Sequence, residues 1–184
     1  MTARRIFHYL FIGLLGVCLW GCAYPISKAW RKEVNPAVTF SQVAEKPEAH
    51  WGKIVIWGGV VIDLRTRSGT TRMLIIQNPL DSRGRPDTRM PEGRFIARTE
   101  DFINPERYKR GTMVTLAGEI IGERDVTSGP MKIPYPVVKI LELHRWEERW
   151  GEEMQKKVEA FDPGFYPPFS SPMGEPRYGA PEGP

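Results

Sequence analysis

The sequence predicts a mainly β protein built on a small five-stranded barrel. Five short apolar segments lie between residues 51 and 145, and clusters of Gly, Pro, Ser and Asn separate them. No stretch of about 10–15 residues between these segments has a helical pattern, which disfavours a doubly wound βαβ fold. Because the chain has 184 residues, it is long enough for one ordinary domain. Five strands in about 100 residues suit an OB-like barrel, and an open antiparallel sandwich is the alternative.

The first 21 residues have the pattern of a secretory signal peptide. Arg4 and Arg5 precede an apolar run of about 15 residues, which is shorter than the roughly 20 that a helix needs to span a bilayer. The run ends in Leu19-Trp20-Gly21-Cys22, which resembles the bacterial lipobox. In that motif the signal is cleaved between the equivalents of Gly21 and Cys22, and the cysteine thiol carries a diacylglyceryl group.

Two other interpretations of this segment remain open. One is a plain signal or short anchor with an incidental cysteine, and the other is the weak twin-arginine pattern Arg4-Arg5-x-Phe7. Cys18 is a poor lipidation site, because Val17 precedes it where a small residue is required. Residue 23 is Ala and not the Asp that commonly retains lipoproteins in the inner membrane, so we expect an outer-membrane protein facing the periplasm.

Removal of the signal peptide also changes the charge of the chain. The net charge of +4 includes Arg4 and Arg5, and without them 24 basic residues face 22 acidic ones. This balance is too mild to imply nucleic-acid binding.

Residues 22–50 are expected to form a lipid-anchored tether and a short helix. The tether is polar and contains Pro25 and Pro36, and the helix begins with Ser41 as its N-cap and ends before Pro47.

The barrel is expected over residues 51–145. Its predicted strands are Lys53–Leu64, Thr71–Asn78, Gly93–Arg98, residues 112–122 and Tyr135–Leu143, with a helical turn or tight loop at Asn104–Tyr108. In the first strand, alternation predicts that one parity is buried: Ile54, Ile56, Val60, Ile62 and Leu64. In the fourth strand the buried set is Val114, Leu116, Gly118 and Ile120. Gly58 and Gly59 in mid-strand indicate a sharp bend or a close approach of another backbone.

After the barrel, the spacing of the apolar residues changes from every second residue to every fourth. Trp146, Trp150, Met154 and Val158 recur every four residues, so residues 146–161 are predicted to be a helix. The apolar stripe of this helix is expected either to pack against the barrel or to contact a partner or the membrane. Residues 162–184 contain seven Pro and four Gly, which predicts a disordered tail.

The chain shows little sign of an enzyme, a metal site or a cofactor. Its two cysteines lie within the first 22 residues, and the histidines of the mature chain, His50 and His144, have no zinc-binding spacing. Gly-x-Ser-x-Gly is absent. We therefore expect no catalytic residue, no metal and no cofactor.

An arginine-rich stretch is the stronger candidate for a binding site. Between Arg65 and Arg98 there is no lysine and only three acidic residues. Guanidinium groups bind phosphate and carboxylate with two parallel hydrogen bonds. The candidate anion-binding residues are Arg65, Arg67, Arg72, Arg83, Arg85, Arg89, Arg94 and Arg98.

Several short motifs, taken together, resemble the Slp family of starvation-inducible outer-membrane lipoproteins. They are the lipobox cysteine, Gly52-Lys53, Trp57-Gly58-Gly59-Val60, Gly93-Arg94-Phe95, Tyr108-x-x-Gly111, Val114-Thr115-Leu116-Ala117-Gly118, and Tyr135-Pro136-Val137-Val138 before Trp146. The resemblance covers roughly residues 11–150, and the C-terminal helix and tail are not part of it. It implies a stress- or starvation-linked envelope lipoprotein and carries over no catalytic residue.

The sequence thus predicts a non-enzymatic outer-membrane lipoprotein with a structural or interaction role. The alternative is a binding module for an anionic envelope ligand, such as lipid A, a phospholipid or a glycan, that uses the Arg65–Arg98 region. The expected partners are the membrane, through the N-terminal lipid, and an envelope protein or anionic glycolipid. Nucleic acid is not expected. An enzyme that acts on an envelope polymer is the least favoured hypothesis.

Overall fold

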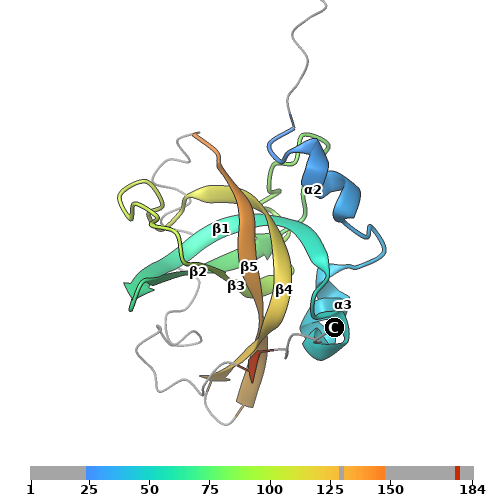
Figure 1. The fold of residues 1–184 in the computed structure, drawn as a ribbon, viewed down its shortest axis with the longest axis vertical. Coiled ribbons are helices and arrows are strands. Elements are labelled where there is room, and N and C mark those ends of the chain that lie inside the picture. Colours follow the sequence, from blue (N-terminus) through green and yellow to red (C-terminus); the bar gives the residue numbers. More distant parts are fainter. Residues whose placement is uncertain (1–23, 129–130, 148–176, 179–184) are drawn as a thin grey trace, which may run out of the picture.

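Five long strands form a closed barrel in the computed structural model, which describes residues 24–128, 131–147 and 177–178 (Figure 1). The strands are β1 (Ile54–Arg67), β2 (Thr70–Asn78), β3 (Gly93–Thr99), β4 (Met113–Ser128) and β5 (Met131–Arg145). Their order is β1-β2-β3-β5-β4, and pairing of β1 with β4 closes the sheet. Only the β3–β5 pair among these five is parallel. The predicted five-stranded OB-like barrel is confirmed.

The predicted burial of β1 was wrong over its first half. Val55, Trp57 and Val61 enter the main core, whereas Ile54 and Ile56 are only half-buried. Both parities of this strand are apolar, so alternation alone could not identify the inner face. The register then shifts at a β-bulge between Val61 and Asp63. Since a bulge changes which parity faces inward, Leu64 still packs against the core, as predicted.

In β4 the predicted inner face is confirmed. Val114, Leu116 and Ile120 are fully buried in the same cluster as the core residues of β1. The predicted close approach at the mid-strand glycines of β1 is also present. A Cβ atom on Gly59 would overlap the carbonyl oxygen of Ile76 on β2. This position therefore requires glycine for space.

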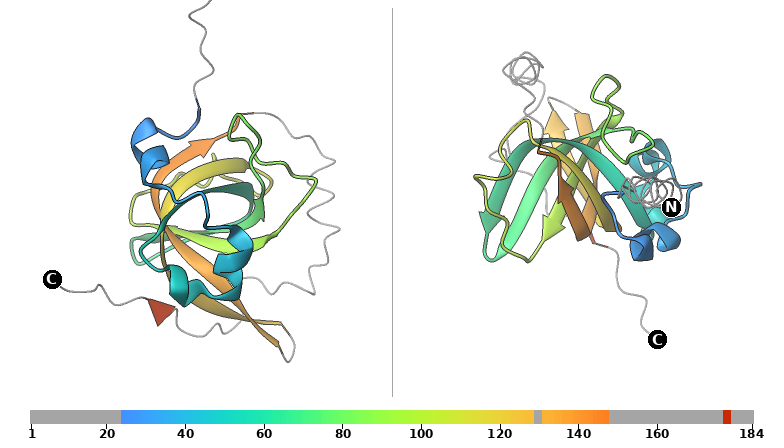
Figure 2. Two further views of the ribbon diagram at one scale, coloured as in Figure 1. Left: turned by 90° about the vertical axis from the view of Figure 1, so that its right-hand side faces the viewer. Right: turned by 90° about the horizontal axis from the view of Figure 1, so that it is seen from above.

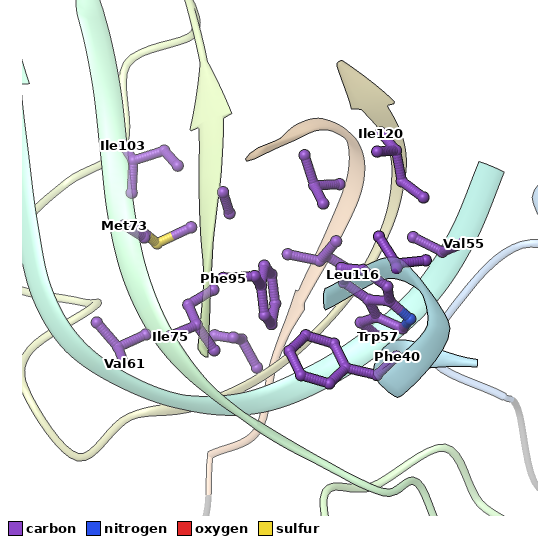
Figure 3. Close-up of a cluster of buried hydrophobic side chains, with 14 residues drawn as sticks. Phe40, Val55, Trp57, Val61, Met73, Ile75, Phe95, Ile103, Leu116 and Ile120 are labelled. Atoms are coloured by element: carbon purple, nitrogen blue, oxygen red, sulfur yellow. The ribbon is translucent and has the colours of Figure 1, made fainter. Parts of the chain in front are cut away.

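A short helix, α3 (Phe40–Glu45), covers one opening of the barrel. Its Phe40 ring meets Trp57 edge-on with a centroid distance of 5.0 Å, and Trp57 meets Phe95 at 5.2 Å. In Figure 3 the rings of Phe40 and Trp57 lie at one end of the core, Phe95 lies in its middle, and Ile103 from the β3–β4 connection lies at the other end. The predicted N-cap, Ser41, was wrong. Thr39 is the cap, and it forms a capping box with Gln42.

The N-terminal segment is more ordered than the predicted tether. It contains the helix α2 (Lys28–Glu33), and Ile26 before it is only 1% exposed. A 3-10 turn, η1 (Pro47–His50), leads from α3 into β1.

At the other end of the chain, Trp146 and Glu147 follow β5 without helical structure. The rest of the predicted helix, to residue 161, lies outside the described residues. Within the predicted tail only Arg177–Tyr178 is described, and these two residues form the strand β6 beside Gly122 and Glu123 of β4.

Candidate functional site

The folded part of the chain begins almost immediately after the predicted lipidation site. Gly21 and Cys22 lie outside the described residues, and the first described residue is Tyr24. The rings of Tyr24 and Pro25 lie against the Cα of Gly84 in the loop between β2 and β3. Ser27 donates its backbone N–H to both carboxylate oxygens of Glu142 on β5, at 3.1 Å each. The segment that follows Cys22 is thus attached to the barrel.

The structure divides the eight candidate arginines into separate groups. Arg65, Arg72 and Arg98 occupy directly opposed positions on β1, β2 and β3. The same row continues on β5, where Lys139 is the partner position of Arg98. Opposed residues in a sheet point to the same face, and neighbouring strands are about 4.8 Å apart. The Cα atoms of these four cations therefore span about 14 Å across the outside of the barrel; we call them the basic row.

Three carboxylates offset part of the charge of the basic row, and one of them, Glu119 on β4, lies at the position opposite Lys139. Asp63 forms an ion pair with Arg65 at 3.0 Å, and Glu100 lies 3.4 Å from Arg98. Like charges directly opposite each other destabilise a sheet. The carboxylates beside Arg65 and Arg98 reduce the repulsion that Arg72 experiences from these two arginines.

Apolar side chains lie next to the basic row on the outer face. Leu74, Ile96 and Val137 occupy opposed positions on β2, β3 and β5 and form a buried cluster with Tyr135. These positions have the opposite parity to the core residues Met73 and Ile75 of β2. The outer face thus combines a buried apolar band with a line of cations.

A second group of arginines lies in the β2–β3 loop, residues 79–92. The carboxylate of Asp81 accepts the backbone N–H groups of Arg83 and Arg85, at 2.9 and 2.8 Å. Asp87 binds Arg89 through both carboxylate oxygens, at 2.8 and 2.6 Å. Those hydrogen bonds lower the pKa of Asp87 to about 2. The guanidinium of Arg89 is therefore already engaged with a carboxylate.

The two remaining candidates belong to neither group. Arg67 is exposed at the end of β1, next to the β1–β2 hairpin turn. Arg94 is on β3 opposite Ile76 and is 8% exposed. The eight arginines therefore do not form one site, although three of them align.

The two histidines lie in different surroundings. His50 Nδ1 is 3.2 Å from the Lys53 ammonium, and burial followed by this positive charge lowers the pKa of His50. His144 meets Trp146 edge-on at 4.8 Å. Among the described residues there is no group of three or more His, Cys, Asp or Glu side chains that could hold a metal ion. In that same part of the chain, no helix is long and apolar enough to cross a membrane.

Sequence reasoning missed two parts of this arrangement. Lys139 was not a candidate, because it is remote in sequence from the arginines and only the parallel β3–β5 pairing brings it beside Arg98. The attachment of residues 24–27 was also missed. The apolar Ile26 within a polar segment was the available signal for it.

Comparison with known proteins defines the class as outer membrane lipoproteins. The model of a family described as "Outer membrane lipoprotein Slp family" matches residues 19–176, which include both the lipobox and the barrel. The chain belongs to this Slp family. The match continues to residue 176, so the family likeness extends beyond the residue-150 limit that the short motifs indicated.

Two relatives from Escherichia coli strain K12 agree with this assignment. The chain is 26% identical to "Uncharacterized lipoprotein YeaY" over 172 residues. The aligned region covers 93% of the chain and 88% of the relative. The chain is 32% identical to "Outer membrane protein Slp" over 103 residues. This aligned region covers 55% of the chain and 53% of that relative. No solved structure matches the chain.

Proposed function

We propose that this protein is anchored to the outer membrane by lipid on Cys22, faces the periplasm, and has a non-enzymatic structural or interaction role in the envelope. The observation that carries the proposal is the lipobox Leu19–Cys22, which lies at the very start of the family match and directly before the folded segment. Each buried acyl CH₂ contributes about 0.8 kcal/mol, and two or more chains anchor a protein stably.

Membrane retention of a cysteine variant tests the anchor. Cys22→Ser removes the acceptor thiol, and we expect the protein to move from the outer-membrane fraction to the soluble periplasmic fraction. Globomycin, which blocks lipoprotein signal cleavage, should leave an uncleaved precursor of the unaltered protein. Cys18→Ser is the matched control and should change neither result. A Cys22→Ser protein that still fractionates with the outer membrane would refute the anchor.

The proposed link to stress or starvation rests on the family resemblance. We expect the protein level to rise when growth stops. Quantitative immunoblotting of exponential and starved cultures tests this, and an unchanged level would count against the link.

The proposed non-enzymatic role is supported by the chemistry of the basic row. Arginine and lysine side chains attract anions, and guanidinium groups bind phosphate or carboxylate with two parallel hydrogen bonds. An interaction surface is therefore the use that this feature favours.

The aligned cations favour a second candidate function, the binding of an anionic envelope ligand. Bidentate guanidinium groups about 5 Å apart would suit a surface bearing several phosphates or carboxylates. The double change Arg72→Gln, Arg98→Gln should weaken salt-sensitive binding to lipid A, anionic vesicles or an acidic glycan. Lys46→Gln, Arg107→Gln is the matched control, because it removes the same charge at two exposed positions outside the row and outside the β2–β3 loop. Binding that is equal in both variants, or insensitive to salt, would reject this function.

A further inference from the structure

We propose that the barrel is held in one fixed orientation on the bilayer. Its membrane-facing end consists of α2 and the β2–β3 loop, residues 79–92, and lies against the phospholipid head groups. We call this region the anchor end. The proposal rests on the lipid anchor proposed at Cys22. It goes further by specifying which end of the barrel faces the membrane and which end faces the periplasm.

The chain between Cys22 and the barrel is too short to act as a flexible tether. Only Ala23 separates Cys22 from Tyr24, so the Cα atoms of Cys22 and Tyr24 are within about 7 Å of each other. A flexible linker of about 16 residues, the length of the tether predicted over residues 23–38, would have a mean end-to-end distance of about 22 Å and would let the barrel rotate.

The residues directly after Ala23 are fastened to the barrel at several points. Ile26 is 1% exposed, and the backbone N–H of Ser27 is bound by Glu142 on β5. The guanidinium of Arg31 lies 4.9 Å from the centre of the Tyr24 ring. Burial raises the pKa of Tyr24, which agrees with the position of its ring against the β2–β3 loop.

The loop that receives Tyr24 is itself fixed to the barrel wall. The Thr115 hydroxyl on β4 is buried and donates to the carbonyl oxygen of Gly84, at 2.7 Å. The Trp146 indole N–H donates to the same hydroxyl oxygen at 3.0 Å. A lipid on Cys22 would therefore be connected to the body of the barrel and not to a loosely held loop. Figures 1 and 2 show the first described residues (blue) beside this loop (green).

The surface of the anchor end suits phospholipid head groups. Five exposed cationic side chains lie on α2 and the loop: Lys28, Arg31, Lys32, Arg83 and Arg89. Met90, beside Arg89, is 66% exposed and offers an apolar side chain to the interface. Over residues 24–33 and 79–92 there are six basic and four acidic residues, so the excess is only +2. The attraction to anionic lipid is therefore modest, and the short covalent connection contributes most to the orientation.

The opposite end of the barrel would then face the periplasm. β2 has nine residues and leads from the β1–β2 hairpin to the β2–β3 loop, a distance of about 27 Å. Phe102 follows the far end of β3, near that hairpin, and is 82% exposed. Arg72 of the basic row lies near the same end of β2. The row would thus be presented to the periplasm and not to the lipid that anchors the protein.

Fluorescence quenching on reconstituted, lipidated full-length protein tests this orientation. Cys18 leaves with the signal peptide and the Cys22 thiol is blocked by lipid, so one introduced cysteine is the only thiol available for a maleimide fluorophore. Met90→Cys reports the anchor end, and Phe102→Cys is its exposed apolar counterpart at the far end. In phosphatidylcholine/phosphatidylglycerol vesicles with a nitroxide on the head group, we expect several-fold stronger quenching at position 90 than at position 102. Equal quenching, or stronger quenching at 102, would overturn the proposal.

A linker variant tests the cause of the orientation. Insertion of about 16 Gly and Ser residues between Ala23 and Tyr24 should make quenching at the two positions similar while leaving the barrel intact. A difference that survives this insertion would contradict the role of the short connection, as would a difference in the unaltered protein that disappears at high salt. If the protein fails to float with the vesicles, lipidation at Cys22 is what has failed, so failure of the anchor can be distinguished from failure of the orientation.

Discussion

At the scale of single residues, Asp87 shows how a local contact changes the chemistry of a side chain. The side-chain hydrogen bonds from Arg89, and then its backbone N–H, lower the pKa of Asp87 from 3.8 to about 2. A carboxylate whose pKa is lower in the folded state stabilises the fold above its unfolded pKa. This contribution is therefore complete above about pH 4 and is lost as the pH falls from about 4 to 2.

We predict that Arg89→Gln raises the pKa of Asp87 toward its ordinary value. The substitution removes the charged donors, while the backbone N–H of residue 89 remains. Titration of the carboxyl ¹³C chemical shift measures this pKa. Arg83→Gln is the matched control in the same loop and should leave the Asp87 titration unchanged. A pKa near 2 in the Arg89→Gln protein would contradict the contact.

At the scale of elements, α3 depends on its N-cap, Thr39, which directly precedes the helix. The Thr39 hydroxyl oxygen accepts the Gln42 N–H at 3.3 Å, and the Gln42 side chain returns a hydrogen bond to the Thr39 N–H at 3.1 Å. Six residues are too few for a helix to be stable alone, so the cap and the packing of Phe40 hold this one in place.

We predict that Thr39→Ala lowers the free energy of unfolding by about 1 kcal/mol, because the Gln42 N–H loses its partner. Ser41→Ala is the control, and it should change stability by less than about 0.5 kcal/mol, since Ser41 is exposed and is not the cap. Urea unfolding of the mature chain with Cys22→Ser measures both values. A larger loss for Ser41→Ala would contradict the observed cap.

The strands show why part of the fold followed from the sequence and part did not. In β4 the apolar positions alternate with polar or small ones, so Val114, Leu116 and Ile120 could be assigned to the core. In β1 apolar residues occupy both parities, and the bulge after Val61 has no signature in the sequence. Periodicity therefore identified both strands. It identified the inner face of β4, where the alternate positions are polar or small, but not that of β1, where residues at both sets of alternate positions are apolar.

At the scale of the whole molecule, segments from outside the five strands complete the core of the barrel. Phe40 of α3 completes the aromatic cluster with Trp57 and Phe95. Ile103 fills the core from the β3–β4 connection. The helix α3 and the β3–β4 connection thus help to exclude water from the barrel interior.

We predict that Phe40→Ala lowers the free energy of unfolding by about 3–5 kcal/mol, because it leaves a cavity beside Trp57. Phe102→Ala makes the same chemical change at an exposed position and should cost less than about 0.5 kcal/mol. Urea titration followed by tryptophan fluorescence compares the two variants. Similar losses in both would contradict the role of α3 as the cover of the barrel.

The sequence by itself determined the class of this protein: five β-segments, a lipobox cysteine and a stretch of arginines, all read from local pattern and residue type. Tertiary structure decided which of those arginines act together, because strand register, and not distance along the chain, aligns Arg65, Arg72 and Arg98 with Lys139. It also decided that the residues after Cys22 belong to the barrel. Their partners, Gly84 and Glu142, lie about 60 and 115 residues further along the chain. Contacts between such distant segments depend on how the whole chain closes, which a local sequence pattern does not encode.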